Sequence, residues 1–461
     1  MLSEQAMWPV LHWPLLRRTT SAPGEWGRAV GAAVGSLARA RLERAAEALG
    51  PGRPSSSSSG GAGGDPPSSS SAFEGAAGGS RALVGFAGND YLGLAGHPDV
   101  RRAAAAAAAR FGMGSRGSPL VCGHSTLHER LERELAALKG AEAAALFPSG
   151  FAANTGVLAA LAGRPDAAVF SDALNHASIV DGCRLAARGG ADVRVFRHLD
   201  LADLERRLEG CDRPLKLVVT DSVFSMDGDL ADLRGLAQLR ARHGFLLMVD
   251  DAHGTLVLGG GAGGGAAQAA GVESDVDLAV GTLSKAFGAQ GGFVACSALL
   301  KRLLVSRARP YIFSTALPLP SVAAALAALG VARREGPARR ARLARNVRVL
   351  REALGTLAPE GALGNAGAGA GGGALEWRDS PIVPVVVGSE ETALSAAAGL
   401  RARGFHVPAI RPPTVAPGTC RLRVTLSAAH SEGEVRALAE ALRDALSAAA
   451  ADGGAQAAAR L

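Results

Sequence analysis

The feature that most constrains the fold of this chain is a series of seven short apolar runs separated by helical patterns. The runs lie at 143–147, 167–170, 193–196, 217–219, 245–249, 278–280 and 293–295. Runs that are this short and this apolar are typical of strands buried on both faces, and such strands occur mainly in parallel sheets covered by helices. We therefore predict an α/β fold with a mostly parallel seven-stranded sheet and helices on both of its faces.

The composition along the chain predicts four parts. Residues 1–80 form an N-terminal arm that ends in a Ser/Gly/Pro-rich segment at 51–80, a composition typical of disorder. A large α/β domain is predicted over 81–330, a small C-terminal α+β domain over 331–450, and a flexible tail over 451–461. A glycine-rich segment at 364–373 is predicted to be a surface loop, and another lies at 259–265. Capping-box patterns predict helix starts at Thr126 and Ser431.

Charge, cysteine content and hydropathy exclude several classes of function. The formal net charge is +7, but the arginines are spread along the chain. Their densest group, within 333–348, is predicted to be the polar face of a helix with Leu343, Val347 and Leu350 inside. The five cysteines are far apart, which favours neither a disulfide framework nor a metal site. No apolar run approaches the roughly 20 residues of a membrane helix. We expect no nucleic-acid, membrane or metal partner.

Polar residues and glycines follow five of the predicted strands. Gly150 comes shortly after the first run. Four longer polar segments, at 171–176, 220–225, 250–254 and 281–285, follow the runs that end at 170, 219, 249 and 280. Because the carboxyl ends of parallel strands meet at one edge of a sheet, we expect these segments to lie close together. They supply an amine, carboxylates, two imidazoles, hydroxyls and a helix start that can bind phosphate. This set of groups suits pyridoxal phosphate (PLP), an aldehyde cofactor with a phosphate and a pyridine nitrogen.

Lys285 is the residue predicted to bond to the cofactor aldehyde. It is one of four lysines, with 139, 216 and 301, in a chain whose other basic residues are nearly all arginine. Only an amine that can lose its proton can attack an aldehyde, and arginine cannot. Asp250 is predicted to pair with the pyridine nitrogen, and His176 and His253 to contact the ring. The phosphate is predicted to be bound by Gly150, Thr282 and Ser284.

Longer motifs resemble the α-oxoamine synthases, a family of PLP-dependent enzymes. They are Asn89-Asp-Tyr-Leu-Gly93, Phe224-Ser-Met-Asp-Gly-Asp229, Asp250-Asp-Ala-His-Gly254 and Thr282-Leu-Ser-Lys285, and the likeness runs from about Phe86 to Leu446. The resemblance implies the type I fold of PLP-dependent transferases and a homodimer with shared active sites. The segments 112–123, 172–178 and 410–430 are most similar to members that condense L-alanine with pimeloyl-CoA or pimeloyl-acyl carrier protein, releasing CO2 and forming 8-amino-7-oxononanoate for biotin biosynthesis.

The resemblance also implies a role for each matching residue. Lys285, His176 and Asp250 would be catalytic, with Lys285 moving the Cα proton of the amino acid. The cofactor would contact the backbone of Gly150 and Phe151 and the side chains of His176, Ser225, Asp250, His253, Thr282, Ser284 and Lys285, and Thr315 would reach the phosphate of the partner subunit. Substrate would contact Asn89, His176, Thr414 and Arg423.

The assignment of Arg423 to the substrate carboxylate has independent support. Arg421, Arg423 and Thr425 alternate with apolar residues, which predicts a strand with one polar face. A guanidinium fork on that face suits a carboxylate. Bacterial family members carry an early substrate-contacting arginine, for which Arg39, Arg41 and Arg44 are candidates here.

Two other functions remain open at this point. One is a sister synthase that uses glycine, such as glycine C-acetyltransferase or 5-aminolevulinate synthase, because the choice of amino acid depends on pocket shape. The other is a catalytically silent partner subunit of the kind found among serine palmitoyltransferase chains, although such chains lack the lysine present here at 285. The tripeptide Ala459-Arg-Leu461 resembles the peroxisomal signal and predicts a peroxisomal location, with the cytosol as the alternative.

Overall fold

The computed structural model describes residues 82–355 and 380–459, with side chains described up to residue 449. The predicted N-terminal arm with its three candidate arginines, the segment 364–373 and the end of the tail lie outside the described residues. Contacts group the described residues into one compact unit. Within the described residues, no helix is both long and apolar enough to cross a membrane.

The predicted seven-stranded sheet is confirmed, in the order β2-β8-β7-β6-β5-β3-β4. Its strands are β2 (Ala143–Phe147), β3 (Ala167–Asp172), β4 (Asp192–Phe196), β5 (Leu215–Asp221), β6 (Leu246–Asp250), β7 (Leu278–Thr282) and β8 (Gly292–Cys296). Only β8 runs antiparallel to its neighbours. Nine residues join β7 to β8, which is too few for the crossover that a parallel neighbour requires.

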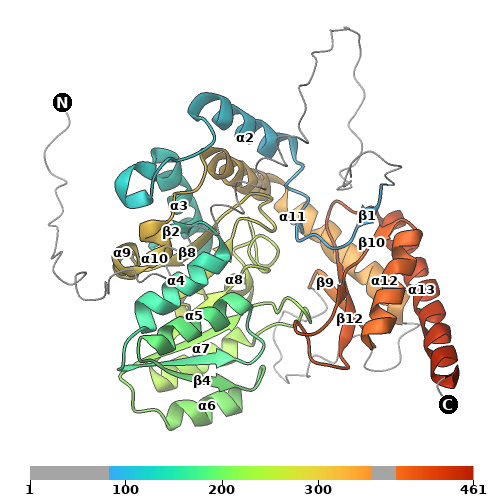
Figure 1. Ribbon diagram of the computed structural model, residues 1–461. Helices are drawn as coiled ribbons and strands as arrows, with labels where there is room; N and C mark the ends of the chain where they lie inside the picture. Colours follow the sequence, from blue (N-terminus) through green and yellow to red (C-terminus); the bar gives the residue numbers. More distant parts are fainter. Residues whose placement is uncertain (1–81, 356–379, 460–461) are drawn as a thin grey trace, which may run out of the picture. The chain divides into compact units, whose positions relative to one another are not determined.

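Helices cover both faces of this sheet, as the apolar runs predict (Figure 1). Adjacent residues of one strand point to different cores: Val169 belongs to the core on one face, and Phe170 belongs to the core on the other. The helices of this part are α2 (Pro98–Phe111), α3 (Thr126–Lys139), α4 (Gly150–Ala162), α5 (Ala177–Arg188), α6 (Leu201–Glu209), α7 (Leu233–His243), α8 (Ala266–Ala270), α9 (Ala298–Arg307) and α10 (Arg309–Phe313), with short turns η2 (Pro119–Gly123) and η3 (Glu273–Asp275).

The predicted helix start at Thr126 is confirmed, but the capping residue lies one position earlier. Ser125, not Thr126, is the N-cap of α3, and its capping-box partner is His128. Both neighbours carry a hydroxyl, but Ser125 has the extended backbone that a cap residue needs, with φ −132° and ψ 170°. The capping box at Ser431 is confirmed, because the backbone N–H of Ser431 donates to the Glu434 carboxylate and the backbone N–H of Glu434 donates to Ser431 Oγ.

The smaller C-terminal part contains two sheets. Strands β9 (Ile382–Gly388), β11 (Ala409–Ile410) and β12 (Cys420–Thr425) form one, and β1 (Val84–Gly85) pairs with β10 (Phe405–His406) in the other. Helices α12 (Glu390–Ala402), α13 (Glu432–Ala459) and the 37-residue α11 (Leu319–Gly355) complete it. The predicted domain boundary at residue 330 lies inside α11 and stays a prediction.

Candidate active site

A chain of hydrogen bonds runs from Lys285 to the start of the described chain. Lys285 follows β7, and its Nζ lies 2.7 Å from Nε2 of His253, which follows β6. Nδ1 of His253 lies 2.5 Å from the hydroxyl of Tyr91, and that hydroxyl lies 3.1 Å from Oδ1 of Asn89. The predicted partnership of Lys285 and His253 in one site is therefore present, with Tyr91 as an additional member.

The surroundings of Lys285 favour its neutral form. Burial disfavours the ammonium and, against the opposing charges of Asp250 and Asp221, lowers the Lys285 pKa to about 8. Burial, followed by the charge of Lys285, also lowers the pKa of His253 well below its usual value, so this imidazole stays neutral. A neutral amine beside a neutral imidazole can act as a nucleophile and then move a proton.

Asp250 stands at the end of β6 and is held by a buried network. Its Oδ2 accepts a hydrogen bond of 2.6 Å from Nδ2 of Asn154, which also donates to Ser178 Oγ. Nδ1 of His176 lies 2.7 Å from the same Ser178 hydroxyl. Burial, opposed by the charge of Asp250, lowers the His176 pKa. The network brings the predicted ring-contacting residues His176 and Asp250 together through Asn154 and Ser178.

A second carboxylate, Asp221, lies beside Asp250. The two residues are aligned partners on the parallel strands β5 and β6, and both are buried. Asp221 accepts a hydrogen bond of 2.7 Å from the backbone N–H of His176. Burial and the charge of Asp250 raise the pKa of Asp221 well above its ordinary value. Two buried carboxyl groups side by side favour a cationic group between or beside them.

The start of α4 and the end of β7 approach each other closely. A Cβ atom at Gly150 would lie 3.3 Å from Cβ of Thr282, so glycine permits this approach. The backbone N–H groups of Gly150 and Phe151 belong to the first helical turn, where intrahelical acceptors are lacking. Thr282 Oγ1 lies 2.7 Å from Ser284 Oγ. N–H groups at a helix start beside two hydroxyls form a cradle for a phosphate.

Arg423 on β12 connects the small sheet to this group. It is buried, and its Nε donates to the backbone carbonyl of Ser225. Its terminal nitrogens lie 3.3 and 3.4 Å from Oδ1 of Asn89, and one donates to Thr425 Oγ1 at 3.0 Å. The predicted substrate-contacting residues Asn89 and Arg423 therefore meet, close to the predicted cofactor residue Ser225.

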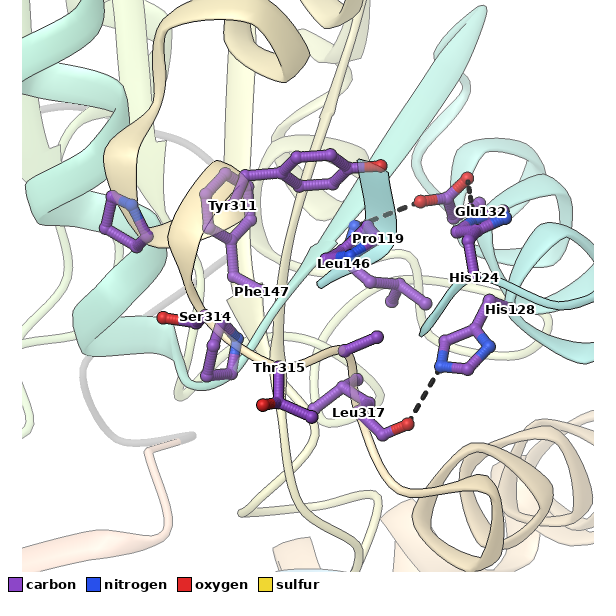
Figure 2. Close-up of a pocket in the computed structure, with 13 residues that line it drawn as sticks. Pro119, His124, His128, Glu132, Leu146, Phe147, Tyr311, Ser314, Thr315 and Leu317 are labelled. Carbon is purple, nitrogen blue, oxygen red and sulfur yellow. Dashed lines mark hydrogen bonds and ion pairs between the residues drawn. The ribbon is translucent and has the colours of Figure 1, made fainter. Parts of the chain in front are cut away.

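Two predicted site residues lie apart from this group. Thr414 is in an exposed loop, where its backbone N–H bonds to the carbonyl of Arg411. Thr315 is also exposed and lines a small pocket with His128 and Tyr311 (Figure 2). Within the described residues, no hydrogen bond links either threonine to the group around Lys285, and their roles stay predictions.

Sequence reasoning missed three members of the site: Tyr91, Asn154 and Asp221. Tyr91 lies inside the motif at 89–93 and is one of only two tyrosines, which was an available signal. Asn154 is a fully buried amide in an otherwise apolar helix, and its side chain meets Asp250 across 96 sequence positions. Asp221 shows no pattern that separates it from a strand-end cap, since only the register with Asp250 reveals its position.

Comparison with known proteins identifies the family. Residues 81–442 match the aminotransferase class I and II family. The chain belongs to this family. A protein of Arabidopsis thaliana named 8-amino-7-oxononanoate synthase is 48% identical over 380 residues, covering 79% of this chain and 75% of the relative. A synthase of the same name from Anaeromyxobacter dehalogenans is 53% identical over 364 residues, covering 79% of this chain and 86% of the relative.

Solved structures with a similar fold agree with this assignment. A Sphingomonas wittichii serine palmitoyltransferase superposes with a TM-score of 0.73 at 34% identity, over 80% of this chain and 89% of that one. A Francisella tularensis 8-amino-7-oxononanoate synthase gives a TM-score of 0.64 at 26% identity, over 78% and 97% of the two chains. A further serine palmitoyltransferase with a TM-score of 0.73 and 32% identity was solved with PLP bound.

The residues of this family member fit PLP. The cradle at Gly150 and Thr282 matches a phosphate, and the Lys285 amine with a pKa of about 8 matches an aldehyde. A protonated ring nitrogen beside Asp250 would relieve the charge repulsion between the two buried carboxyl groups. The Oδ1 of Asn154, which has no hydrogen-bond partner in the described structure, also leaves an acceptor open beside Asp250.

Proposed function

We propose that this chain condenses L-alanine with a pimeloyl thioester, releasing CO2 and the thiol carrier and forming 8-amino-7-oxononanoate for biotin biosynthesis. The observation that carries the proposal is the identity of 47–53% to several 8-amino-7-oxononanoate synthases over about four fifths of the chain. It is supported by a site that contains each group the family chemistry uses: an amine with a lowered pKa, a ring-nitrogen partner, a phosphate cradle and a carboxylate-binding arginine.

Different residues of the chain have different roles in the proposed reaction. PLP, when bound, supplies the electron sink that stabilises negative charge at the amino-acid Cα. Lys285 Nζ holds the cofactor and then removes and returns the Cα proton, which its lowered pKa permits. Asp250, oriented by Asn154, keeps the ring nitrogen protonated. Arg423 and Asn89 orient the carboxylate of the amino acid, and the neutral His253 donates or accepts a hydrogen bond beside Lys285.

The choice of amino acid and acyl donor is tested directly. Purified PLP-loaded protein is incubated with L-alanine or glycine, each with pimeloyl-CoA, pimeloyl-acyl carrier protein or acetyl-CoA, and products are identified by mass spectrometry. We expect efficient turnover of alanine with a pimeloyl thioester. Turnover of glycine with acetyl-CoA and none of alanine would replace the proposal by the glycine-using alternative. Absence of a visible cofactor band in the protein would instead favour a silent partner subunit.

We also propose that the working form is a homodimer whose subunits share their active sites. Large apolar side chains are exposed on three neighbouring segments: Met113 is 68% exposed, Val121 on η2 82% and Phe313 on α10 67%. A second copy of this chain is the occupant we assign to this surface, because the exposed Thr315, which the family resemblance assigns to the phosphate of the partner subunit, lies two residues after α10. Sedimentation velocity should give a dimer. Thr315→Val should weaken PLP binding and leave the dimer intact.

Peroxisomal location is proposed from the sequence alone, and the cytosol remains the alternative. A fluorescent protein extended by the last ten residues of this chain is expected to enter peroxisomes, and the same fusion without Ala459-Arg-Leu461 is expected to stay in the cytosol. An identical diffuse distribution of the two fusions would contradict the proposal.

A further inference from the structure

A histidine outside the predicted site bridges two loops that carry site residues. His198 lies in the connection between β4 and α6. Its Nδ1 lies 2.8 Å from Oδ1 of Asp172, and its Nε2 lies 2.7 Å from Oδ2 of Asp229. Both carboxylates are buried, with 2% and 4% of their surfaces exposed. An imidazole with a carboxylate at each nitrogen can donate to both only when it is protonated.

The two carboxylates belong to two segments that carry or adjoin predicted site residues. Asp172 is the last residue of β3, and its Oδ1 accepts from the N–H of Leu174 in the loop that leads to His176. Asp229 closes the turn that begins at Phe224, through the bond from Phe224 N–H to the Asp229 carbonyl. Because β3 lies between β4 and β5 in the sheet, a side chain that follows β4 can reach both segments.

The turn from Phe224 to Asp229 is held from its other side by the small sheet. Arg423 donates to the carbonyl of Ser225, and Arg421 forms an ion pair with Asp227. Only Oδ2 of Asp229 has a hydrogen-bond partner in the described structure, and that partner is His198. The small sheet therefore holds one side of this turn, and His198 is the partner that holds the Asp229 carboxylate on the other.

We propose that His198 is a positioning residue that ties the loop carrying His176 to the turn that holds Arg423, so that the ring-contacting and carboxylate-binding groups keep a fixed separation. The inference rests on the proposed function for its substrate readout. It assigns His198 no contact with substrate or cofactor.

The charges around His198 keep it protonated over the ordinary pH range. Burial alone would lower its pKa, but the hydrogen bonds and charges of Asp172 and Asp229 outweigh burial and raise the pKa to about 9. On its own segment, Arg197 and Asp200 pair with each other. The ring of Phe224 packs edge-on against it at 4.4 Å and carries no charge. The bridge is therefore complete at pH 7 and is lost as the pH rises through about 9.

The test compares PLP-loaded wild type with His198→Gln and with Asp229→Asn. We expect His198→Gln to lower kcat/KM for alanine by about 10- to 100-fold, mainly through a higher KM, because a site displaced by about 1 Å loses that much. We expect Asp229→Asn, which keeps the fold but removes one charge, to shift the alkaline limb of the kcat/KM profile to lower pH. His243→Gln is the matched control, since His243 also pairs with a carboxylate, Glu205, but lies at the end of α7.

Two outcomes would overturn the proposal. One is a His198→Gln protein with kcat/KM within twofold of wild type, whatever its melting temperature. The other is an Asp229→Asn protein whose pH profile coincides with that of wild type, and this result is informative even where His198→Gln does not fold. If wild type makes no product from alanine, the proposed function fails. The role of His198 is then tested by alanine binding: the alanine concentration that gives half of the change in cofactor absorbance is compared between wild type and His198→Gln.

Discussion

Replacing Lys285 by methionine should stabilise the cofactor-free protein near neutral pH while abolishing its chemistry. The pKa of Lys285 falls from the ordinary lysine value of 10.5 to about 8. This difference means that the charged form of the amine destabilises the folded protein by about 3 kcal/mol. The variant loses the hydrogen bond to His253, and part of the lysine side chain still contacts solvent. We therefore expect a net gain of about 1–2 kcal/mol in the free energy of unfolding.

The gain in stability from Lys285→Met should depend on pH in a defined direction. Below pH 8 the amine is protonated in both the folded and the unfolded chain, so the wild type bears the full cost. Between pH 8 and 10.5 the unfolded chain binds more protons than the folded one, so the stability of the wild type rises with pH. The advantage of Lys285→Met should therefore be largest below pH 8 and disappear as the pH approaches 10.5.

The assay is urea unfolding of both proteins after removal of the cofactor with hydroxylamine, at several pH values between 7 and 10. Lys216→Met controls for the general effect of removing a lysine, since Lys216 lies at the start of β5 and outside the site. A variant less stable than wild type at pH 7, or an advantage that stays constant with pH, would refute the reasoning that burial depresses the pKa of this amine.

Three further substitutions test other parts of the structure. Leu199 adopts a left-handed backbone with φ 56°, so Leu199→Asn should raise the free energy of unfolding by about 0.5–1 kcal/mol, measured by urea unfolding. Lys139→Met should lower it by about 3–5 kcal/mol, because it leaves the buried carboxylate of Asp251 without its cation; a loss below 1 kcal/mol would contradict this. Tyr91→Phe should lower kcat/KM about tenfold by removing the hydrogen-bond partner of His253 Nδ1, whereas Tyr311→Phe, which changes the only other tyrosine, should leave activity intact.

The sheet and the strand-end location of the site could be predicted because both depend on local patterns. Seven apolar runs are enough to indicate buried strands, and parallel strands bring their carboxyl ends together whatever their order. Strand order, however, is set by crossovers that no short window of sequence records. The adjacency of Asp221 and Asp250, and the bond between Asn154 and Asp250, follow from that order. These members of the site could therefore be recognised only in the folded chain.

The bridge through His198 is another contact that the sequence alone could not predict. Asp172 and Asp229 lie 26 and 31 positions from His198, on segments that the sequence alone treats as separate strand-end loops. Each residue by itself resembles a turn or cap residue, for which aspartate and histidine are ordinary choices. Only the placement of β3 between β4 and β5 turns three unremarkable polar residues into one charged bridge.

Catalysis is not the only reason for which this chain retains a lysine. Lys139 is buried, and its Nζ donates to Asp251 at 2.5 Å, to Thr255 Oγ1 at 2.8 Å and to the Gly264 carbonyl at 2.9 Å. A compact ammonium can satisfy three convergent acceptors in that space, whereas a planar guanidinium cannot. Lysine is thus retained where a small cation is needed as well as where an amine must lose its proton.

The surroundings separate the two cases. Lys139 has a carboxylate partner, whereas among the described residues no carboxylate forms an ion pair with Lys285, whose closest polar partner is the neutral His253. We therefore expect Lys139→Arg to reduce stability, because the larger cation does not fit among its three acceptors, and to leave the visible cofactor band in the protein that remains folded. Lys285→Arg should fold normally but show neither that band nor turnover. The opposite pattern in urea unfolding and absorbance spectra would show that burial alone does not distinguish a structural lysine from a reactive one.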